Sequence, residues 1–472
     1  MDLHKLSITE YVDLIKSKKI SVFDAVKQFT DKAAKDKHNA VLEVFSSWMD
    51  KAKSLDERIA NDEKVGKFAG VPVFIKDNIL YKGHKSSASS NILKDFVSPY
   101  SSTVVSKLLK EDAIIIGRTN MDEFAMGNSG ESSRTGAIKN AVDTTRIAGG
   151  SSGGAAVALK LGYCLISIGS DTGGSVRQPA SINGVFGIKP TYGSVSRYGV
   201  IAYASSIEQV GVFANTVGDT KLALKAISGN DPMDATTHIE PQEKPSKKPK
   251  LGYISELHYS YIGSKHSATY ESAFEKLTTI YGEITPISIP GLADKALAVY
   301  YIMAFIESSS NLARYDGVRY TNISTPKNNN EERSFVELMS DTRTELLGKE
   351  AKRRILLGNY LMSRGHSLAD LYNKAISYQQ ELRKSFKKAM ESVDAIILPV
   401  THGPAQKIGE ITDPVAGYLE DLFTVPANLL HIPAMSVPFG TAEGLPMGVQ
   451  LLGDKNTENM LFEIAEKLME GV

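Results

Sequence analysis

The chain has a single cysteine, no excess charge of either sign and no long uninterrupted apolar stretch. Cys164, alone among 472 residues, excludes a disulfide framework and a cysteine-based zinc site within this chain. The 54 Lys and Arg balance 54 Asp and Glu, which argues against bulk electrostatic binding of nucleic acid. The most apolar long segment, Ala155 to Gly169, contains Lys160 and is shorter than the ~20 residues of a membrane helix. The charged N-terminal sequence lacks the apolar core of a signal peptide. We therefore expect a cytoplasmic protein with no membrane association.

Short apolar runs alternate with helical patterns from Val71 onward. VPVFI, AIIIG and LISIGS are typical of buried strands, whereas STVVSKLLK and GAAVALKLG are typical of helices. This alternation predicts βα units around a largely buried sheet. We expect one compact α/β domain over residues 66–472, with a helical segment, residues 1–65, packed on its core.

Local patterns refine this outline. Ser7 with Glu10, and Ser21 with Asp24, have the spacing of helix N-cap pairs. We predict long helices, two further strands, a Pro/Lys-rich surface connection and a polar loop at, in that order, about 292–315, 333–362 and 367–392; 394–400 and 445–453; 240–250; and 326–332.

Two glycine-rich segments centred on serines carry most of the candidate chemistry. RIAGGSSGGAAVAL places glycines around Ser151 and Ser152 just before a helix, and GSDTGGSVRQPA places Ser175 after Gly173 and Gly174. Glycine permits positive φ and close backbone approach, so both segments can turn sharply and direct N–H groups at one point. Successive N–H groups in such turns bind anions or oxyanions.

Three interpretations of these turns compete. A phosphate loop is disfavoured, because neither a terminal Gly-Lys-Ser/Thr nor G-x-G-x-x-G occurs. GGSSG at 149–153 matches the nucleophile elbow of α/β-hydrolases, with Ser151 as nucleophile. An esterase of that kind needs a histidine, and the downstream histidines, none with a flanking pattern of a base, are His238, His258, His266, His366, His402 and His431. Turns that merely pack helices against a sheet would explain one cluster better than two.

Lys76 ends the apolar run GVPVFIK. A lysine at such a position usually extends its amine into water. If the strand end is buried, however, the charged form loses solvation and its pKa falls. The neutral amine can then act as a general base without a histidine.

Lys76, Ser151 and Ser175, together with the two glycine segments, resemble the amidase signature family. The resemblance implies that family's α/β fold, a large central mixed β-sheet covered on both faces by helices. It also implies a Ser–cis-Ser–Lys triad: Ser175 as nucleophile, Ser151 as the bridging serine after a cis peptide at Gly150, and Lys76 as base.

The oxyanion hole of that family uses backbone N–H groups of the turn before the nucleophile. The resemblance assigns this role to Thr172, Gly173 and Gly174.

Four further stretches narrow the resemblance to the A subunits of tRNA-dependent amidotransferases, which hydrolyse glutamine. They are GRTNMDEFAMGNS, SSNLARYDGVRY, GKEAKRRILLG and YLEDLFTVPANL, at 117–129, 309–320, 348–358 and 418–429. This implies a heterotrimer with subunits B and C, in which ATP, Mg²⁺ and the misacylated Glu-tRNA(Gln) or Asp-tRNA(Asn) are bound by the former of these two partners. It implies no cofactor and no metal on this chain.

Recognition of free glutamine requires a cation for its α-carboxylate and an acid for its α-ammonium group. The resemblance assigns these roles to Arg354 and Asp421, with Tyr301 and Ser129 lining the pocket, and leaves Arg353 as an alternative to its neighbour. Without the resemblance, the basic run is an exposed helix face, and the aspartate is a helix cap or part of an ion pair.

Other functions remain open from the sequence. A stand-alone amidase acting on a small carboxamide would use the same triad. A histidine-dependent esterase and a non-catalytic scaffold that has kept the turns are further alternatives.

Overall fold

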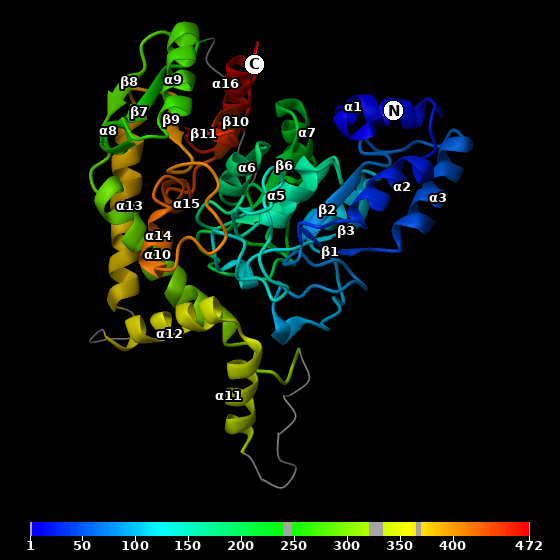
Figure 1. Cartoon of the computed structure of the whole chain (residues 1–472), viewed down its shortest axis with the longest axis horizontal. Helices are drawn as coiled ribbons and strands as arrows, with labels where there is room; N and C mark the ends of the chain where they lie inside the picture. The colour runs from blue at the N-terminus through cyan, green and yellow to red at the C-terminus, as the bar shows by residue number, and fades with distance from the viewer. Residues whose placement is uncertain (1, 239–247, 262, 321–333, 365–369, 472) are drawn as a thin grey trace.

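The computed structural model describes residues 2–238, 248–261, 263–320, 334–364 and 370–471 (Figure 1). In this part of the chain an 11-stranded sheet has the order β1-β3-β2-β4-β6-β5-β10-β11-β9-β7-β8. Parallel and antiparallel pairs are mixed, and helices surround the sheet, so the predicted fold class is confirmed. The polar loop at 326–332 and most of the predicted surface connection at 240–250 lie outside the described residues.

The N-terminal segment is mainly helical, as predicted. Ser7 forms a capping box with Glu10, and the Ser21 hydroxyl accepts from the Asp24 N–H. Side chains of these helices belong to the same hydrophobic core as the sheet, although the boundary at residue 65 stays a prediction. The helices are α1 (Ile8–Lys16), α2 (Val22–Ala33) and α3 (Trp48–Ala60), preceded by the short η1 (Leu3–Lys5).

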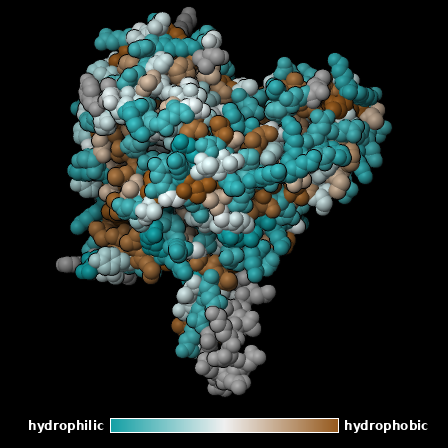
Figure 2. Space-filling model, in the orientation of Figure 1, coloured by the Kyte–Doolittle hydropathy of each residue, from teal (hydrophilic) through white to brown (hydrophobic). Residues whose placement is uncertain are grey.

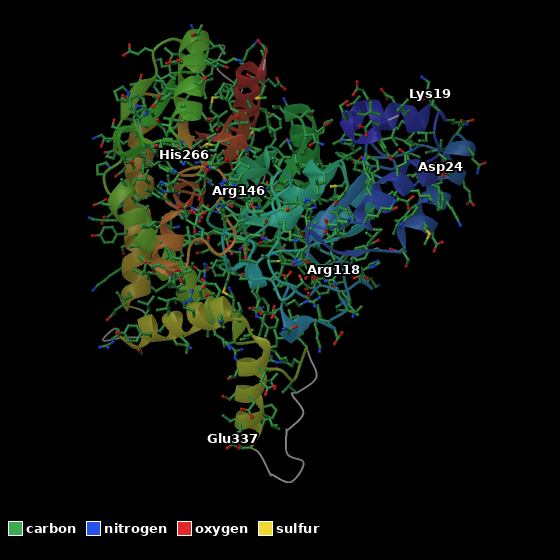
Figure 3. All side chains as sticks on the ribbon, viewed as in Figure 1. Lys19, Asp24, Arg118, Arg146, His266 and Glu337 are labelled. Carbon is green, nitrogen blue, oxygen red and sulfur yellow. The ribbon has the colours of Figure 1, made fainter. Side chains whose placement is uncertain are left out.

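This segment also contributes a strand, so the expectation that it is purely helical was wrong. β1 (Val41–Val44) pairs antiparallel with β3 (Ile114–Thr119) at the edge of the sheet. The strand is short and only half-buried, and therefore has no distinct apolar pattern. Arg118 of β3 donates to Glu43 of β1 and to Asp77, which ties this edge to the end of the neighbouring strand (Figure 3).

Three adjacent strands position the candidate site. They are parallel and fully buried, because each is a run of apolar and small residues. Their carboxyl ends therefore meet at one edge of the sheet, where β2 ends with Lys76 and β4 ends with Asp171. The strands are β2 (Pro72–Lys76), β3 and β4 (Ile166–Asp171).

The rest of the sheet is formed by later segments. The two strands predicted near the C-terminus are present and pair with each other antiparallel. The strands are β5 (Phe186–Lys189), β6 (Gln209–Ala214), β7 (Leu251–Ile254), β8 (Thr285–Ile287), β9 (Ala395–Pro399), β10 (Ala434–Ala442) and β11 (Leu445–Gly453).

Two groups of helices cover the sheet. One group, α5 and α6, packs on the central strands and includes the helices that follow the two glycine-rich segments. The other group, α4, α7, α9 and α16, packs across β3, β5, β6, β10 and β11. Their bounds are α4 (Thr103–Lys110), α5 (Gly153–Lys160), α6 (Arg177–Asn183), α7 (Val217–Ile227), α9 (Ala268–Tyr281) and α16 (Glu458–Met469), with the short helices α8 (Ser255–Tyr261), α14 (Pro414–Leu419) and α15 (Val425–Leu429) between other elements.

The single helix predicted over 333–362 is two helices. The backbone is extended at Leu347 and Gly348, so α11 ends before them and α12 begins after them. A glycine favours such a break because it stabilises helix interiors poorly. Figure 1 shows α11 projecting away from the body of the molecule, whereas α12 turns back onto it. The helices are α10 (Leu292–Leu312), α11 (Phe335–Leu346), α12 (Lys349–Ser363) and α13 (Asp370–Ala389).

Close packing of α12 on α10 depends on Gly358. A Cβ at this position would overlap the carbonyl of Phe305, so only glycine allows the two helices to approach this closely. The approach matters for the site, because α10 carries Tyr301 and α12 carries Arg354.

The visible surface mixes hydrophilic and hydrophobic residues, with a group of hydrophobic side chains at the lower left, over α12 and α13 (Figure 2). Leu356 and Tyr360 of α12 are exposed there. Within the described ranges, none of the helices combines the length and the apolar character needed to cross a membrane.

Candidate active site

Lys76 is buried at the end of β2 and directs its amine at two serines. Its Nζ donates to Ser151 Oγ at 2.7 Å and to Ser170 Oγ, on β4, at 3.0 Å. The Gly150–Ser151 peptide is cis, as the resemblance implied. The parallel strands explain the arrangement, because they bring the lysine beside β4 while α5 begins directly after the cis segment.

Ser175 reaches the same place from the second glycine-rich segment. Its carbonyl oxygen accepts a hydrogen bond of 3.2 Å from the N–H of Ser152, so its backbone lies against the cis segment. The side chain is 6% exposed, in contrast to the fully buried Ser151. The three residues predicted as a triad thus come from three separate segments that meet at one edge of the sheet.

The environment of Lys76 favours the neutral amine. Burial removes water from the ammonium form and lowers the pKa of Lys76 to about 7, although the charges of Glu208, Asp122 and Asp171 act in the opposite direction. The amine is therefore able to accept a proton near neutral pH, with no histidine involved. Ser151 receives its hydrogen bond from this lysine, which argues against the esterase interpretation; His366 lies outside the described residues.

The turn before Ser175 is held by the carboxylate of Asp171. The N–H of Gly174 donates to Asp171 Oδ1 at 3.0 Å, and that of Val176 to Oδ2 at the same distance. Of the three N–H groups predicted for an oxyanion hole, that of Gly174 is therefore already engaged. Among the described residues no partner is found for the N–H groups of Thr172, Gly173 and Ser175, and the last of these was not predicted.

Both glycines of this turn are required by their neighbours. A Cβ on Gly173 would overlap the Tyr300 hydroxyl, and one on Gly174, which has φ of 132°, would overlap Thr424. The backbone of the turn consequently lies directly against α10 and the start of α15, which leaves no room for side chains.

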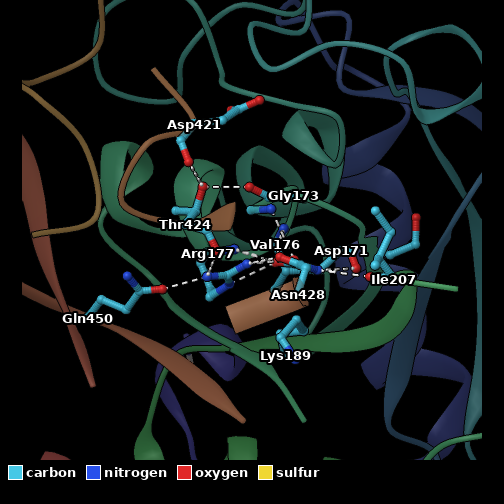
Figure 4. Close-up of polar contacts among 12 residues, drawn as sticks. Asp171, Gly173, Val176, Arg177, Lys189, Ile207, Asp421, Thr424, Asn428 and Gln450 are labelled. Atoms are coloured by element: carbon cyan, nitrogen blue, oxygen red, sulfur yellow. Dashed lines mark hydrogen bonds and ion pairs between the residues drawn. The ribbon is translucent and has the colours of Figure 1, made fainter. Parts of the chain in front are cut away.

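A buried ion pair supports the turn from below (Figure 4). Arg177 Nη2 lies 2.8 Å from Asp171 Oδ1, and both side chains are fully buried. The remaining guanidinium hydrogens are satisfied by Thr424 O, Gln450 Oε1 and Asn428 Oδ1. Burial alone would raise the pKa of the Asp171 carboxyl, but Arg177 holds it well below its usual range. The sequence signal for this pair was present, because both residues flank GGS in GSDTGGSVR, but the partners on distant segments had none.

A cavity of about 710 Å³ opens next to this cluster. Its walls come from three regions: residues 122–134, the first two turns of α12, and residues 401–420. Lys76, Ser151 and Ser175 are not among its lining residues, but Asp122 and Gln178 are. Both contact the cis segment, since the Asp122 N–H donates to the Ser151 carbonyl and the Gly150 N–H donates to Gln178 Oε1. The cavity therefore ends against the backbone of the serine cluster.

Arg354 and Arg353, which the sequence could not separate, differ sharply. Arg354 is buried, with Nε 2.8 Å from Glu350 Oε1 and Nη1 2.7 Å from the Tyr203 hydroxyl. Its guanidinium lies 5.5 to 5.8 Å from the ring centres of Tyr203, Tyr301, Phe305 and Tyr418. The Arg353 side chain is 42% exposed and pairs with the other oxygen of Glu350. Both line the cavity, but only Arg354 is fixed among aromatic rings.

Asp421 lies beside this aromatic group. It accepts hydrogen bonds from the Tyr301 hydroxyl at 2.6 Å and from Asn128 Nδ2 at 3.1 Å. Burial raises the pKa of Asp421 to about 6, which leaves the carboxylate mostly ionised at neutral pH. Ser129, next to Asn128, lines the cavity. The structure thus gathers all four residues predicted to bind substrate on the walls of one cavity or directly behind them; Asn128 was missed, because an asparagine in a loop carries no distinctive signal.

Comparison with known proteins gives consistent results. A family model described as amidase matches residues 24–462. The chain is 41% identical to the A subunit of the glutamyl-tRNA(Gln) amidotransferase of Alkaliphilus metalliredigens, over 98% of this chain and 96% of that protein. The crystal structure of the glutamyl-tRNA(Gln) amidotransferase A subunit from Thermotoga maritima is similar with 35% identity and a TM-score of 0.81, covering 100% and 96% of the two chains. The native peptide amidase from Stenotrophomonas maltophilia is similar with 25% identity and a TM-score of 0.81, covering 99% and 96%.

The buried ion pair below the turn generates a stability prediction. Asp171→Asn should lower the free energy of unfolding by about 3–5 kcal/mol, because it leaves the Arg177 guanidinium buried without its counter-charge. Urea unfolding followed by the fluorescence of Trp48, the single tryptophan, measures the change. Asp31→Asn is the matched control, since Asp31 pairs with Lys27 in water and should contribute little. Equal effects of the two substitutions would contradict the assigned role.

Proposed function

The chain belongs to the amidase family and, within it, to the A subunits of amidotransferases, and we propose that it hydrolyses glutamine and releases ammonia for a tRNA-dependent reaction. One observation carries the proposal: a buried Lys76 amine lies 2.7 Å from the hydroxyl of a serine that follows a cis peptide. The adjacent cavity supports the choice of glutamine, because a buried arginine and a buried aspartate flank it.

The proton steps follow from the environment of Lys76. The neutral amine accepts the proton of Ser151, which in turn takes the proton of Ser175. Ser175 Oγ then bonds to the side-chain amide carbon of glutamine, and the C–N bond breaks as the relay returns a proton to the departing ammonia. Water attacks the resulting ester by the same relay and releases glutamate. A single hard step is thereby divided into two easier ones.

The oxyanion that forms on the amide carbonyl needs fixed donors. The N–H groups of Thr172, Gly173 and Ser175 have no partner among the described residues and so remain available for this purpose. We assign Gly174 a different role from the one predicted, because its N–H holds the turn to Asp171. Donors fixed in a water-poor site cost little reorganisation during the reaction.

The two ends of the amino acid head group require opposite charges. Arg354 would bind the α-carboxylate, and Asp421, ionised at neutral pH, would bind the α-ammonium group. The hydroxyl of Tyr301 and the amide of Asn128 orient the aspartate for this contact. Ser129 completes the wall nearest the serine cluster.

Ammonia is useful only if a partner consumes it. We propose that this chain works in the cytoplasm in a heterotrimer with subunits B and C, the former of which uses ATP and Mg²⁺ to activate misacylated Glu-tRNA(Gln) or Asp-tRNA(Asn). No cofactor or metal is proposed for this chain itself. The balanced charge of the chain supports tRNA contact through the partner.

A stand-alone amidase is the second candidate, and the likeness to a peptide amidase favours it. The same triad would serve both reactions. The two functions differ in dependence on partners: a coupled glutaminase should be weak alone and faster with its partner subunits, ATP and misacylated tRNA.

The central test removes the nucleophile. Ser175→Ala should reduce glutamate release from glutamine at least about 10³-fold, measured with and without the partner subunits, ATP and misacylated tRNA. Ser167→Ala is the matched control, because this serine is buried on the same strand as Ser170 and its hydroxyl has no partner among the described residues. Glutaminase activity that survives Ser175→Ala would refute the mechanism, and activity indifferent to the partners would favour the stand-alone amidase.

The pH dependence follows from Lys76. Only its neutral form accepts a proton, and its pKa is about 7, so kcat/KM for a small neutral amide should fall about tenfold for each pH unit below that value. Glutamine should show a steeper fall below pH about 6, because Asp421 also becomes protonated there. Steady-state rates measured between pH about 5 and 9 check both statements. A flat profile for the neutral amide would contradict a lysine base.

Adjacent arginines provide a matched pair for substrate binding. Arg354→Ala should raise the KM of glutamine at least about tenfold while leaving turnover of a small neutral amide nearly unchanged, because only the zwitterion uses the guanidinium. Arg353→Ala, at an exposed position on the same helix, should change either value by less than about threefold. The assignment fails if both substitutions raise KM equally or neither does.

A further inference from the structure

Two consecutive acids, Asp122 and Glu123, lie between the serine cluster and α12. They belong to the stretch GRTNMDEFAMGNS, of which the mechanism above uses only the last residues. The Asp122 carboxylate accepts the N–H groups of Gly130 and Ser132 at 3.0 Å, so it organises the loop around the cis segment. The neighbouring side chain of Glu123 serves a different element.

Glu123 is bonded to the beginning of α12. It is 3% exposed, and its Oε2 accepts from the N–H of Gly348 at 2.8 Å, while its Oε1 accepts from the hydroxyl of Ser90. Gly348 is the residue before the first turn of α12 and offers no side chain of its own as a cap. A Cβ on Gly348 would overlap Glu123 Oε2, so the contact requires glycine at this break between α11 and α12.

An unusual backbone directs Glu123 toward α12. Phe124 and Ala125, which follow it, have φ of 50° and 60°, a conformation that non-glycine residues rarely adopt. Surrounding contacts hold this turn: the Phe124 N–H donates to the Ala88 carbonyl at 2.9 Å, and its ring stacks on Tyr315 with centroids 5.0 Å apart. The chain thereby reverses, and Asn128 follows on the cavity wall. Strained turns of this kind persist where the surrounding structure enforces them.

The Glu123–Gly348 bond therefore joins two walls of the cavity. One wall is the loop that contains Asp122 and Ser129, which contacts the cis segment; the other is the first two turns of α12, which carry Arg354. A helix is rigid over this length, so fixing its start also fixes the position of the guanidinium.

We propose that Glu123 is a positioning residue: by fixing the start of α12 to the loop around the cis segment, it sets the distance between Arg354 and Ser175. The inference rests on the proposed function, because it treats that distance as the length of the glutamine molecule between its α-carboxylate and its amide. Glu123 itself does not touch the substrate in this scheme.

The carboxyl can hold the helix in either protonation state. Burial raises the pKa of Glu123 to about 7, although hydrogen bonds from Ser90 and Gly348 act to lower it. Oε2 accepts from the Gly348 N–H in both forms, and a glutamine oxygen can do the same. A carboxylate at a helix N-terminus gains in addition from the helix dipole.

Steady-state kinetics test this role with three variants. Glu123→Ala should raise the KM of glutamine about tenfold or more, with kcat/KM for a small neutral amide within about twofold of wild type. Glu123→Gln should restore the wild-type KM within about threefold, because its oxygen replaces the acceptor. An unchanged glutamine KM in Glu123→Ala, or an equal loss with both substrates, overturns the proposal.

The matched control is Asp219→Ala. Asp219 is also buried, and its carboxylate accepts the N–H of Ile8 at 2.8 Å at the start of α1, far from the cavity in sequence and element. This variant should lose thermal stability without any change in the KM of glutamine. A similar rise in KM would mean that the effect of Glu123→Ala is general destabilisation, which also overturns the proposal.

A second measurement does not depend on turnover. Hydrogen exchange of residues 348–354 should be faster in Glu123→Ala than in wild type or Asp219→Ala, because the start of α12 loses its anchor. Unchanged exchange overturns the positioning role even if glutamine is not the substrate. Absence of glutamine hydrolysis in the wild-type complex, combined with faster exchange in Glu123→Ala, would instead refute the proposed function alone.

Discussion

The chemistry of this site depends on the removal of one amine from water. Lys76 ends a parallel strand inside the sheet, and burial is the largest effect on its pKa. Three carboxyl groups nearby would favour the ammonium form, but two of them are occupied by other partners: Asp171 pairs with Arg177, and Asp122 accepts from Gly130 and Ser132. Each satisfied carboxylate gives up part of its influence on the lysine, and the amine stays close to neutrality.

The site divides into a reaction part and a recognition part. Strands β2 and β4 and the two glycine-rich turns supply the serines and the lysine, whereas α10, α12 and the segment around Asp421 supply the charged and aromatic groups of the cavity. Aromatic rings surround Arg354, which keeps its side chain in one place while its charge faces the ligand. The two parts meet at few points, among them the acids at 122 and 123.

Local motifs were sufficient to predict the first part. Lys76, Ser151 and Ser175 stand in apolar or glycine-rich contexts that constrain the backbone, and the family resemblance supplied their roles together with the cis peptide. Contacts between distant segments were not predictable: Arg177 meets Gln450 and Asn428 only because the sheet and α15 bring them together. Arg353 and Arg354 are neighbours in sequence but point about 100° apart around a helix, so packing alone decides which one is buried. β1 and the break at Gly348 were missed because short, half-buried elements have weak patterns.

The crowding around Gly173 and Gly174 has an evolutionary consequence. Since Tyr300 and Thr424 occupy the space that side chains would need, this turn tolerates almost no variation, and its neighbours can change only in ways that keep the space closed. The cavity walls on α12 and residues 401–420 carry no such restriction. Divergence toward new amides is therefore channelled into the walls, so that one inherited reaction centre can be paired with many different pockets.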